Sequence, residues 1–178
     1  ILLTHAFGLF VKPEEIFNYG ITNLSEFDIR YAKEKGYKIK LVASCRKVNG
    51  KIFAAVLPKF IRPEDKLYAI DDEYNGVLIE GIFSETQFFS GKGAGSHPTG
   101  SAVLSDISAL TYQYKYEYKK FHQEQEAELS NDFSVEVYVR YQDRSELDTS
   151  DFTRIHESYR SGGENYITGS IHFEKLIN

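Results

Sequence analysis

Three closely spaced glycines separate a strand-like segment from a helix-like segment in the middle of this chain. The apolar run that begins near Asn75 ends at Gly91, Gly93 and Gly95, and a helix is predicted to begin at Pro98. Glycine allows a sharp turn and a close approach of a ligand to backbone amides. Proline is favoured in the first turn of a helix. A strand, a glycine loop and a helix N-terminus together predict a site for a nucleotide, a phosphate or a carboxylate.

The spacing of the loop fits neither of the two best-known phosphate-binding motifs. A P-loop needs a Gly-Lys-Ser or Gly-Lys-Thr end, which is missing, and Ser96 stands where a dinucleotide fingerprint would have its third glycine. Spacing alone therefore leaves a ligand loop and a simple structural turn as alternatives. Val103, Ile107 and Leu110 follow at helical spacing and predict a buried face on the helix.

The first half of the chain predicts an α+β fold in which an antiparallel or mixed sheet is backed by helices. Residues 25–35 are predicted to be a helix that Gly36 ends. Residues 37–46 alternate like a half-buried strand, and Asn49 and Gly50 favour a tight hairpin turn. Further strands are expected at 52–57, where Pro58 weakens continuation, and at 77–82 and 86–89.

The C-terminal part predicts a small β-α-β unit. Residues 133–141 alternate strictly between apolar and polar side chains, as a strand with one buried face does. Ser150 is placed to cap a helix on which Phe152, Ile155 and Tyr159 share one face. Residues 166–173 then read as a second strand.

Two charged clusters are predicted to lie on solvated surfaces. The first is a basic cluster, for which contact with a cofactor phosphate is the alternative, and it consists of Lys33, Lys35, Lys38, Lys40, Arg46, Lys47 and Lys51. The second is the acidic run Asp71 to Glu73, which is expected to form a solvated loop.

Composition excludes several classes of protein. A net charge of −5 with mixed signs argues against nucleic acid and against an anionic membrane surface as partners. No apolar run approaches the ~20 residues of a membrane-spanning helix. The single Cys45 excludes an internal disulfide and suits a reducing compartment such as the cytoplasm, with plain packing as its expected role. The chain contains no methionine, so we expect an excised or processed piece of a longer protein.

No metal site is expected, and no histidine–carboxylate pair can be read from the spacing of the residues. The histidines share no ligand spacing, and they are His5, His97, His122, His156 and His172. His97 is the only one of them in the glycine loop, and we expect it to be solvated there.

The glycine segment resembles the homoserine dehydrogenase family. In that family, a Gly-x-Gly-Ala-Gly loop is followed by Pro-Thr, two small residues, Ala-Val and a helical Asp. The matching positions are Gly91, Gly93, Ala94, Gly95, Pro98, Thr99, Ala102, Val103 and Asp106. Shorter segments resemble the start of the family's substrate domain, at residues 6–8, 20–22, 28–32, 36–41 and 75–81. The resemblance is ordered along the chain and covers about residues 1 to 112.

The resemblance implies an NAD(P)-dependent enzyme that interconverts aspartate semialdehyde and homoserine in threonine and methionine biosynthesis. It implies a substrate and dimerisation domain at 1–115, a linker at 116–130 and a homodimer. The catalytic lysine and the Rossmann domain of the family are expected before Ile1, so this chain alone is expected to be inactive. The residues that the resemblance places at the cofactor are Gly91, Gly93, Ala94, Gly95, Pro98 and Thr99.

The predicted β-α-β unit at 131–178 looks like the first half of an ACT domain, an amino-acid-sensing module often appended to homoserine dehydrogenases. The turn at 143–146 lacks the glycine usual in ACT ligand sites, so a packing or dimer role is an equal alternative. The competing hypothesis for the whole chain is a stand-alone regulatory module that binds an amino acid. A pure sensor would not need the glycine loop and its helix.

Overall fold

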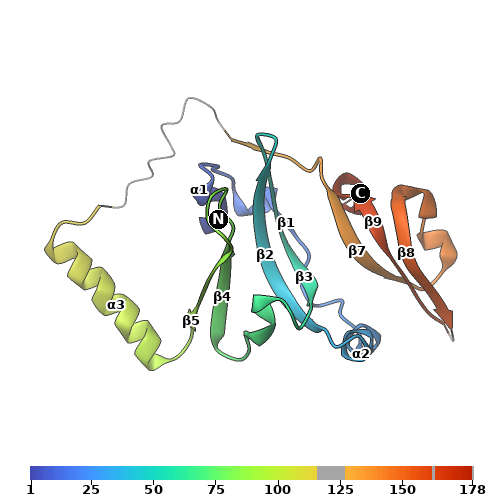
Figure 1. Ribbon diagram of the computed structural model, residues 1–178, viewed down its shortest axis with the longest axis horizontal. Coiled ribbons are helices and arrows are strands. Elements are labelled where there is room, and N and C mark those ends of the chain that lie inside the picture. The colour runs from blue at the N-terminus through green and yellow to red at the C-terminus, as the bar shows by residue number, and fades with distance from the viewer. Residues whose placement is uncertain (116–126, 162, 178) are drawn as a thin grey trace. The chain divides into compact units, whose positions relative to one another are not determined.

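The computed structural model describes residues 1–115, 127–161 and 163–177, and it is a mixed α+β protein (Figure 1). The contacts divide the chain into two units. One unit comprises Ile1–Phe27, Leu41–Pro58 and Tyr118–Asn178, and the other comprises Asp28–Lys40 and Lys59–Glu117. The α+β class predicted from the sequence is confirmed.

A long hairpin forms the centre of the first sheet. Its strands are β2 (Lys38–Val48) and β3 (Lys51–Ile61), and the sheet order is β1-β3-β2, with β6 (Glu128–Leu129) also paired to β3 and β1 spanning Phe17–Asn18. Asn49 and Gly50 have φ angles of 51° and 84°, as the tight primed turns that join paired strands require. The hairpin predicted at these two residues is confirmed.

β3 continues through Pro58, whereas the sequence predicted that it would weaken there. β1 pairs with β3 at Ala55 and Val56, and Pro58 lies beyond these pairs. A missing backbone donor is tolerated where a strand has an open edge.

The first unit buries an aromatic core on β3. Phe53, Ala55 and Phe173 are buried together, and the rings of Phe53 and Phe173 meet edge to face with centroids 4.9 Å apart. Phe173 begins the short helix α4 (Phe173–Ile177) and is fully buried. This core joins the C-terminal segment to the central hairpin. The short helix α1 (Leu2–Ala6) belongs to the same unit.

The C-terminal part is a three-stranded antiparallel sheet and not a β-α-β unit (Figure 1). Its order is β7-β9-β8, and the strands are β7 (Ser134–Tyr141), β8 (Phe152–Ser161) and β9 (Glu164–His172). The helix predicted after Ser150 is wrong, because residues 152–161 form β8. The ACT-like topology predicted for 131–178 is lost with that helix.

The reason for the wrong prediction lies in two irregularities of β8. Its register against β9 shifts between Phe152 and Arg154 and again between Ile155 and Glu157. A bulge sets two residues of one strand against one of its partner. Phe152 and Ile155 are three residues apart but pair with Ile171 and Gly169, which are two apart. The bulged strand therefore acquires the spacing of a helix.

The second unit carries a helix, a hairpin and a second helix. Helix α2 (Glu26–Glu34) matches the prediction and ends before Gly36, which has a φ of 72°. Within this unit, the ring of Phe60 packs on those of Tyr31 and Tyr37, with centroids 5.3 and 6.2 Å apart. Strands β4 (Tyr74–Ile79) and β5 (Gln87–Lys92) form an antiparallel pair, and α3 (Ser96–Thr111) follows β5.

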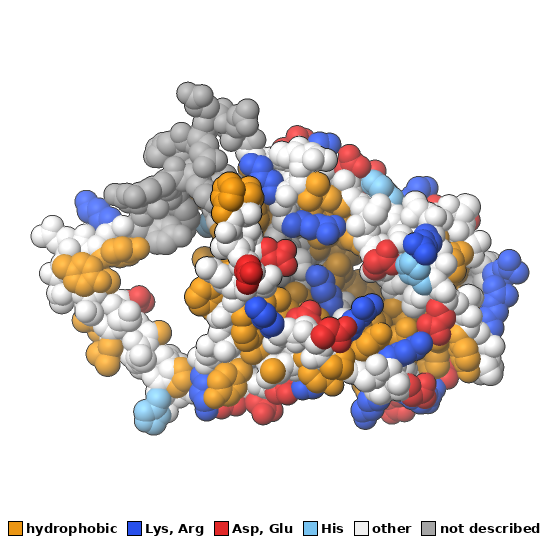
Figure 2. Space-filling view, in the orientation of Figure 1, with side chains coloured by type: hydrophobic (Ala, Val, Ile, Leu, Met, Phe, Trp, Pro, Cys, Tyr) orange, Lys and Arg blue, Asp and Glu red, His pale blue; other side chains and the backbone are white. Residues whose placement is uncertain are grey.

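Helix α3 begins at Ser96, two residues before the predicted start, and its predicted buried face is wrong. Val103, Ile107 and Leu110 are 52%, 53% and 72% exposed. Figure 2 shows hydrophobic side chains in orange along α3, at the left. The helical spacing was correct, but none of the residues of α3 is buried.

Of the predicted linker at 116–130, residues 116–126 lie outside the described residues, and Glu128–Leu129 form β6. None of the helices in the described part of the chain has the length and apolar character to cross a membrane.

Candidate functional site

The β4–β5 hairpin holds the beginning of the glycine loop. Tyr74 pairs with Lys92 at the end of the ladder. The next residue, Gly93, donates its backbone N–H to the carbonyl oxygen of Glu73 over 2.9 Å. Lys92 Nζ lies 2.7 Å from Glu73 Oε1, and this ion pair lowers the pKa of the Glu73 carboxyl. Glu73 therefore contacts the loop with both its backbone and its side chain.

Gly93 and Gly95 are glycines for different reasons. Gly95 has φ 115° and ψ 156°, a conformation that is essentially restricted to glycine. Gly93 has no positive φ, but a Cβ there would overlap Nδ2 of Asn75 and lie 2.8 Å from its Cγ. The loop thus turns at Gly95, while Gly93 lies against a side chain of the neighbouring strand.

The turn at Gly95 leads directly into the first turn of α3. Gly95 is the N-cap residue, and its carbonyl oxygen accepts from the Thr99 N–H over 3.1 Å. Pro98 lies in the first turn, where its missing N–H costs no hydrogen bond, because the first N–H groups of a helix have no partner within the helix. No side chain caps this 16-residue helix at Gly95, so its first N–H groups and the positive end of its dipole are available to an anion.

The structure brings the sequence-predicted site residues together on one exposed stretch. Pro98 is half-buried and the others are exposed, and they are Gly91, Gly93, Ala94, Gly95, Pro98 and Thr99. His97 is also exposed, with its ring Nδ1 3.4 Å from Ser96 Oγ. The arrangement offers backbone amides to a ligand.

Sequence reasoning missed Asn75, which lies on β4, and Glu73, which immediately precedes that strand. The register of the hairpin, in which Asn75 pairs with Gly91, is what brings them to the loop. Without the register, neither residue carries a motif that marks it.

The acidic run at 71–73 is an exposed loop before β4, as the sequence predicted, and its Asp71 is paired with two lysines. Asp71 accepts from Lys38 and Lys40, with Nζ to carboxylate distances of 2.5 and 3.0 Å. The hydrogen bonds from the two lysines lower the pKa of the Asp71 carboxyl. Two members of the basic cluster are thus paired with the one carboxylate of Asp71.

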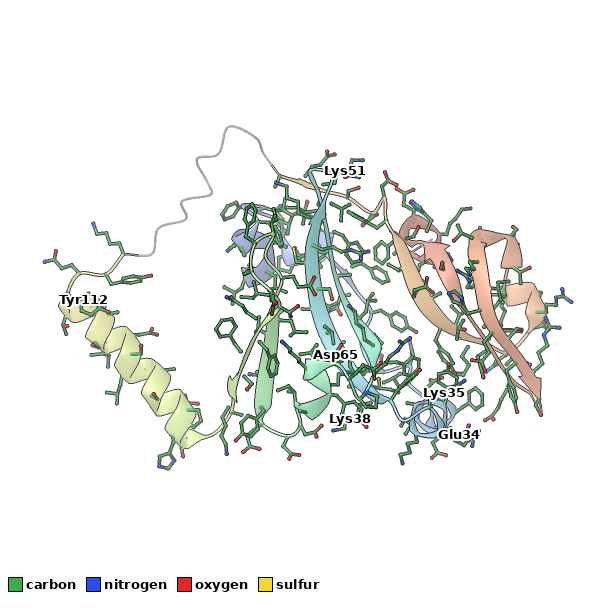
Figure 3. The ribbon with its side chains drawn as sticks, viewed as in Figure 1. Glu34, Lys35, Lys38, Lys51, Asp65 and Tyr112 are labelled. Carbon is green, nitrogen blue, oxygen red and sulfur yellow. The ribbon has the colours of Figure 1, made fainter. Side chains whose placement is uncertain are left out.

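The remaining described members of the basic cluster also include paired side chains. Lys51, at the tip of the β2–β3 hairpin, lies 3.5 Å from Asp132 (Figure 3). Arg46 lies over the rings of Phe53 and Phe133, 5.1 and 5.4 Å from their centroids. These contacts favour a structural role for the cluster over contact with a cofactor phosphate.

Two histidine–carboxylate pairs form, although the spacing of the residues predicted none. His156 Nε2 lies 2.7 Å from Glu136, and His172 Nε2 lies 3.1 Å from Asp132. His156 on β8 meets Glu136 on β7, and His172 on β9 meets Asp132 just before β7, so both pairs join segments that are distant in sequence and could not be predicted from spacing. Ser170 donates to Glu136 and not to a histidine, so these residues do not form a nucleophilic triad.

Among the described residues there is no group of three metal-binding side chains. Cys45 is half-buried, and burial raises the pKa of its thiol. A raised thiol pKa favours packing over a nucleophilic role.

The sequence matches the family model of homoserine dehydrogenase over residues 1–108. The homoserine dehydrogenase of Lactococcus lactis is 33% identical over 115 residues, which are 65% of this chain and 27% of the relative. The Bacillus subtilis homoserine dehydrogenase is 28% identical over 184 residues, which are 99% of this chain and 40% of the relative.

The fold is likewise similar to solved homoserine dehydrogenases. The structure from Thiobacillus denitrificans matches with a TM-score of 0.73 and 27% identity, over 99% of this chain and 46% of the other. A Staphylococcus aureus structure at pH 6.5 matches with a TM-score of 0.67 and 27% identity, over 99% and 47%. This chain therefore spans less than half the length of these relatives, and the similarity extends through the C-terminal sheet.

Proposed function

Because the chain belongs to the homoserine dehydrogenase family, we propose that it supplies the substrate and dimerisation part of an NAD(P)-dependent homoserine dehydrogenase. The complete enzyme would interconvert aspartate semialdehyde and homoserine, in the biosynthesis of threonine and methionine. The observation that carries this proposal is the glycine loop between β5 and α3, whose uncapped helix N-terminus suits a polar or anionic group.

The cofactor-facing residues in this proposal are Gly91, Gly93, Ala94, Gly95, Pro98 and Thr99. A bound nicotinamide cofactor supplies the hydride, and the protein positions it. Gly95 sets the direction in which the chain enters α3, and the first amides of α3 point along the helix axis toward the loop. We assign no catalytic residue within the described part of the chain.

We propose that residues 1–115 form the substrate and dimerisation region, that 116–130 connect it to 131–178, and that the enzyme is a homodimer. The alternative of a stand-alone amino-acid sensor rested on a β-α-β unit. Since residues 152–161 form a strand, that unit is absent, and the described C-terminal sheet gives the sensor no support.

A chimera tests the proposal. The segment of the Bacillus subtilis enzyme that aligns with this chain over 184 residues is replaced by residues 1–178. The chimera is expected to reduce aspartate semialdehyde with NADPH or NADH, and the 178-residue chain alone is expected to give no turnover. A folded chimera with no turnover above a no-protein control would contradict the proposal.

The matched control is the chimera with Gly95→Val. A branched side chain at φ 115° is strained, and it also stands where a ligand would approach the helix N-terminus. This variant is expected to lose cofactor affinity measured by fluorescence titration. Unchanged affinity would mean that the loop is a structural turn only.

A further inference from the structure

We propose that Glu73 is a positioning residue that holds the glycine loop in its binding shape, and that Gly93 is glycine to make room for the side chain of Asn75. This inference rests on the proposed function, because it assigns roles within the proposed cofactor loop. It gives the two glycines different roles. Gly93 leaves room for Asn75 of the hairpin, and Gly95 adopts the positive φ of the turn.

The first step is steric. A Cβ built on Gly93 overlaps Nδ2 of Asn75 and lies 2.8 and 3.3 Å from its Cγ and Oδ1. The contacts to Nδ2 and Cγ are far below ordinary contact and the one to Oδ1 is tight, and all three atoms belong to the one side chain. The backbone of Gly93 has no positive φ, so its conformation alone would accept a side chain. The Asn75 side chain therefore accounts for the glycine at this position.

The second step concerns Glu73, which bonds to the loop at two residues, Gly93 and Lys92. Its carbonyl oxygen accepts from the Gly93 N–H, and its carboxylate pairs with Lys92. Lys92 Nζ also lies 5.4 Å from the centroid of the Tyr74 ring, so the ammonium group is held back over β4. Glu73, just before β4, and Tyr74, the first residue of β4, thus hold Lys92 and Gly93 at the end of β5.

The third step is the consequence for the loop. The ladder and these contacts define the chain up to Gly93, and the turn at Gly95 then sets the start of α3 only two residues later. A displacement at Gly93 is passed directly to the amides at the helix N-terminus. Glu73 would then act on a ligand through the loop and not by touching it.

A double-mutant cycle in the chimera tests the role of Asn75. Gly93→Ala is expected to raise the KM for NADPH about tenfold, with kcat changed less than about threefold, because the added methyl displaces the loop. Asn75→Ala alone is expected to change KM less than about threefold. In the double variant, Asn75→Ala removes the clash, so KM is expected to return to within about threefold of the parent.

The matched control is Gly100→Ala, because Gly100 lies in α3 with no atom near its Cβ position. It is expected to leave KM unchanged. If the double variant is as impaired as Gly93→Ala, the proposal is overturned, and Gly93 is required by the ligand itself. If the parent chimera shows no cofactor-dependent turnover, the proposed function fails instead.

Amide exchange in the 178-residue chain tests Glu73 without any activity. Glu73→Gln is expected to speed exchange of the Gly93 amide about twofold to fivefold, since an exposed ion pair contributes modestly. The reversed pair, Glu73→Lys with Lys92→Glu, is expected to restore the original rate. If Glu73→Gln leaves the exchange rate of the Gly93 amide unchanged, Glu73 does not hold the loop. A reversed pair that fails to restore the original rate would also refute this role.

Discussion

Lys38 Nζ lies 2.5 Å from Oδ2 of Asp71 and joins strand β2 to the segment that leads into β4. The same ammonium group donates to the Tyr68 carbonyl oxygen over 3.1 Å and lies 4.6 Å from the centroid of the Tyr68 ring (Figure 3). Lys40 occupies the other carboxylate oxygen at 3.0 Å. One carboxylate thus pairs with two lysines that are adjacent on one face of β2.

This arrangement predicts acid sensitivity. Because the pKa of Asp71 is lower in the folded chain than in the unfolded one, its stabilising effect is present above about pH 4 and is lost as the pH falls through the folded-state pKa. Asp71→Asn is therefore expected to reduce stability at pH 7, with the difference from the parent shrinking toward pH 2. Urea unfolding at both pH values measures this.

The control for that experiment is Asp72→Asn, which leaves the two lysines paired with Asp71. It is expected to reproduce the pH dependence of the parent. A parent chain and an Asp71→Asn chain with parallel stability curves from pH 7 to pH 2 would contradict the role given to the pair.

Gly95 and Gly100 predict opposite effects of the same substitution. Gly95→Ala is expected to destabilise the chain by about 1–3 kcal/mol, because φ 115° with ψ 156° suits glycine only. Gly100→Ala is expected to stabilise α3 by about 0.5–1 kcal/mol, since alanine is the better helix former. Thermal unfolding followed by circular dichroism compares the two. Equal effects of the same sign would show that the positive φ at Gly95 is not a real constraint.

The elements that could be predicted from sequence are those whose cause is local. Asn49 and Gly50 fix their own turn, and Gly36 ends α2 through its own left-handed conformation. The glycine loop belongs to this class as well, because its turn and its helix start are set by neighbouring residues. The family resemblance rested on that stretch for the same reason.

The features that could not be predicted depend on partners distant in sequence. The spacing in β8 looks helical because bulges against β9 change the phase of its side chains, and no local pattern reveals a bulge. The partners in the Glu73–Lys92 and Asp71–Lys38 pairs are 19 and 33 residues apart in the sequence. Predicting these pairs would require knowing how the strands align. The spacing of the apolar residues predicts that α3 has an apolar face, but it does not reveal whether another segment packs against that face.

The bulges of β8 give a further prediction at Gly169. A Cβ there would collide with the carbonyl oxygen of Arg154 and lie 2.9 Å from Cδ1 of Phe152. Gly169→Ala is therefore expected to destabilise the C-terminal sheet by about 1–3 kcal/mol, as overpacking does. Gly20→Ala is the control, because open space surrounds that position. Chemical unfolding measures both, and a Gly169→Ala chain as stable as the control would mean that the bulged register is wrong.

The exposed apolar surface of the second unit predicts self-association. On α3, Val103, Ile107 and Leu110 are all more than half exposed, and on the hairpin Val77 pairs across the strands with Phe89 while both are exposed. Large exposed apolar patches mark interaction sites, and a symmetric pair of copies is the commonest arrangement. The 20.4 kDa chain is therefore expected to sediment as a dimer at micromolar concentration.

Ile107→Lys and Val77→Lys, tested separately, identify which element carries the contact, because only a substitution in the interface shifts the equilibrium toward the monomer. A parent chain that sediments as a monomer would contradict a homodimer formed by these residues alone.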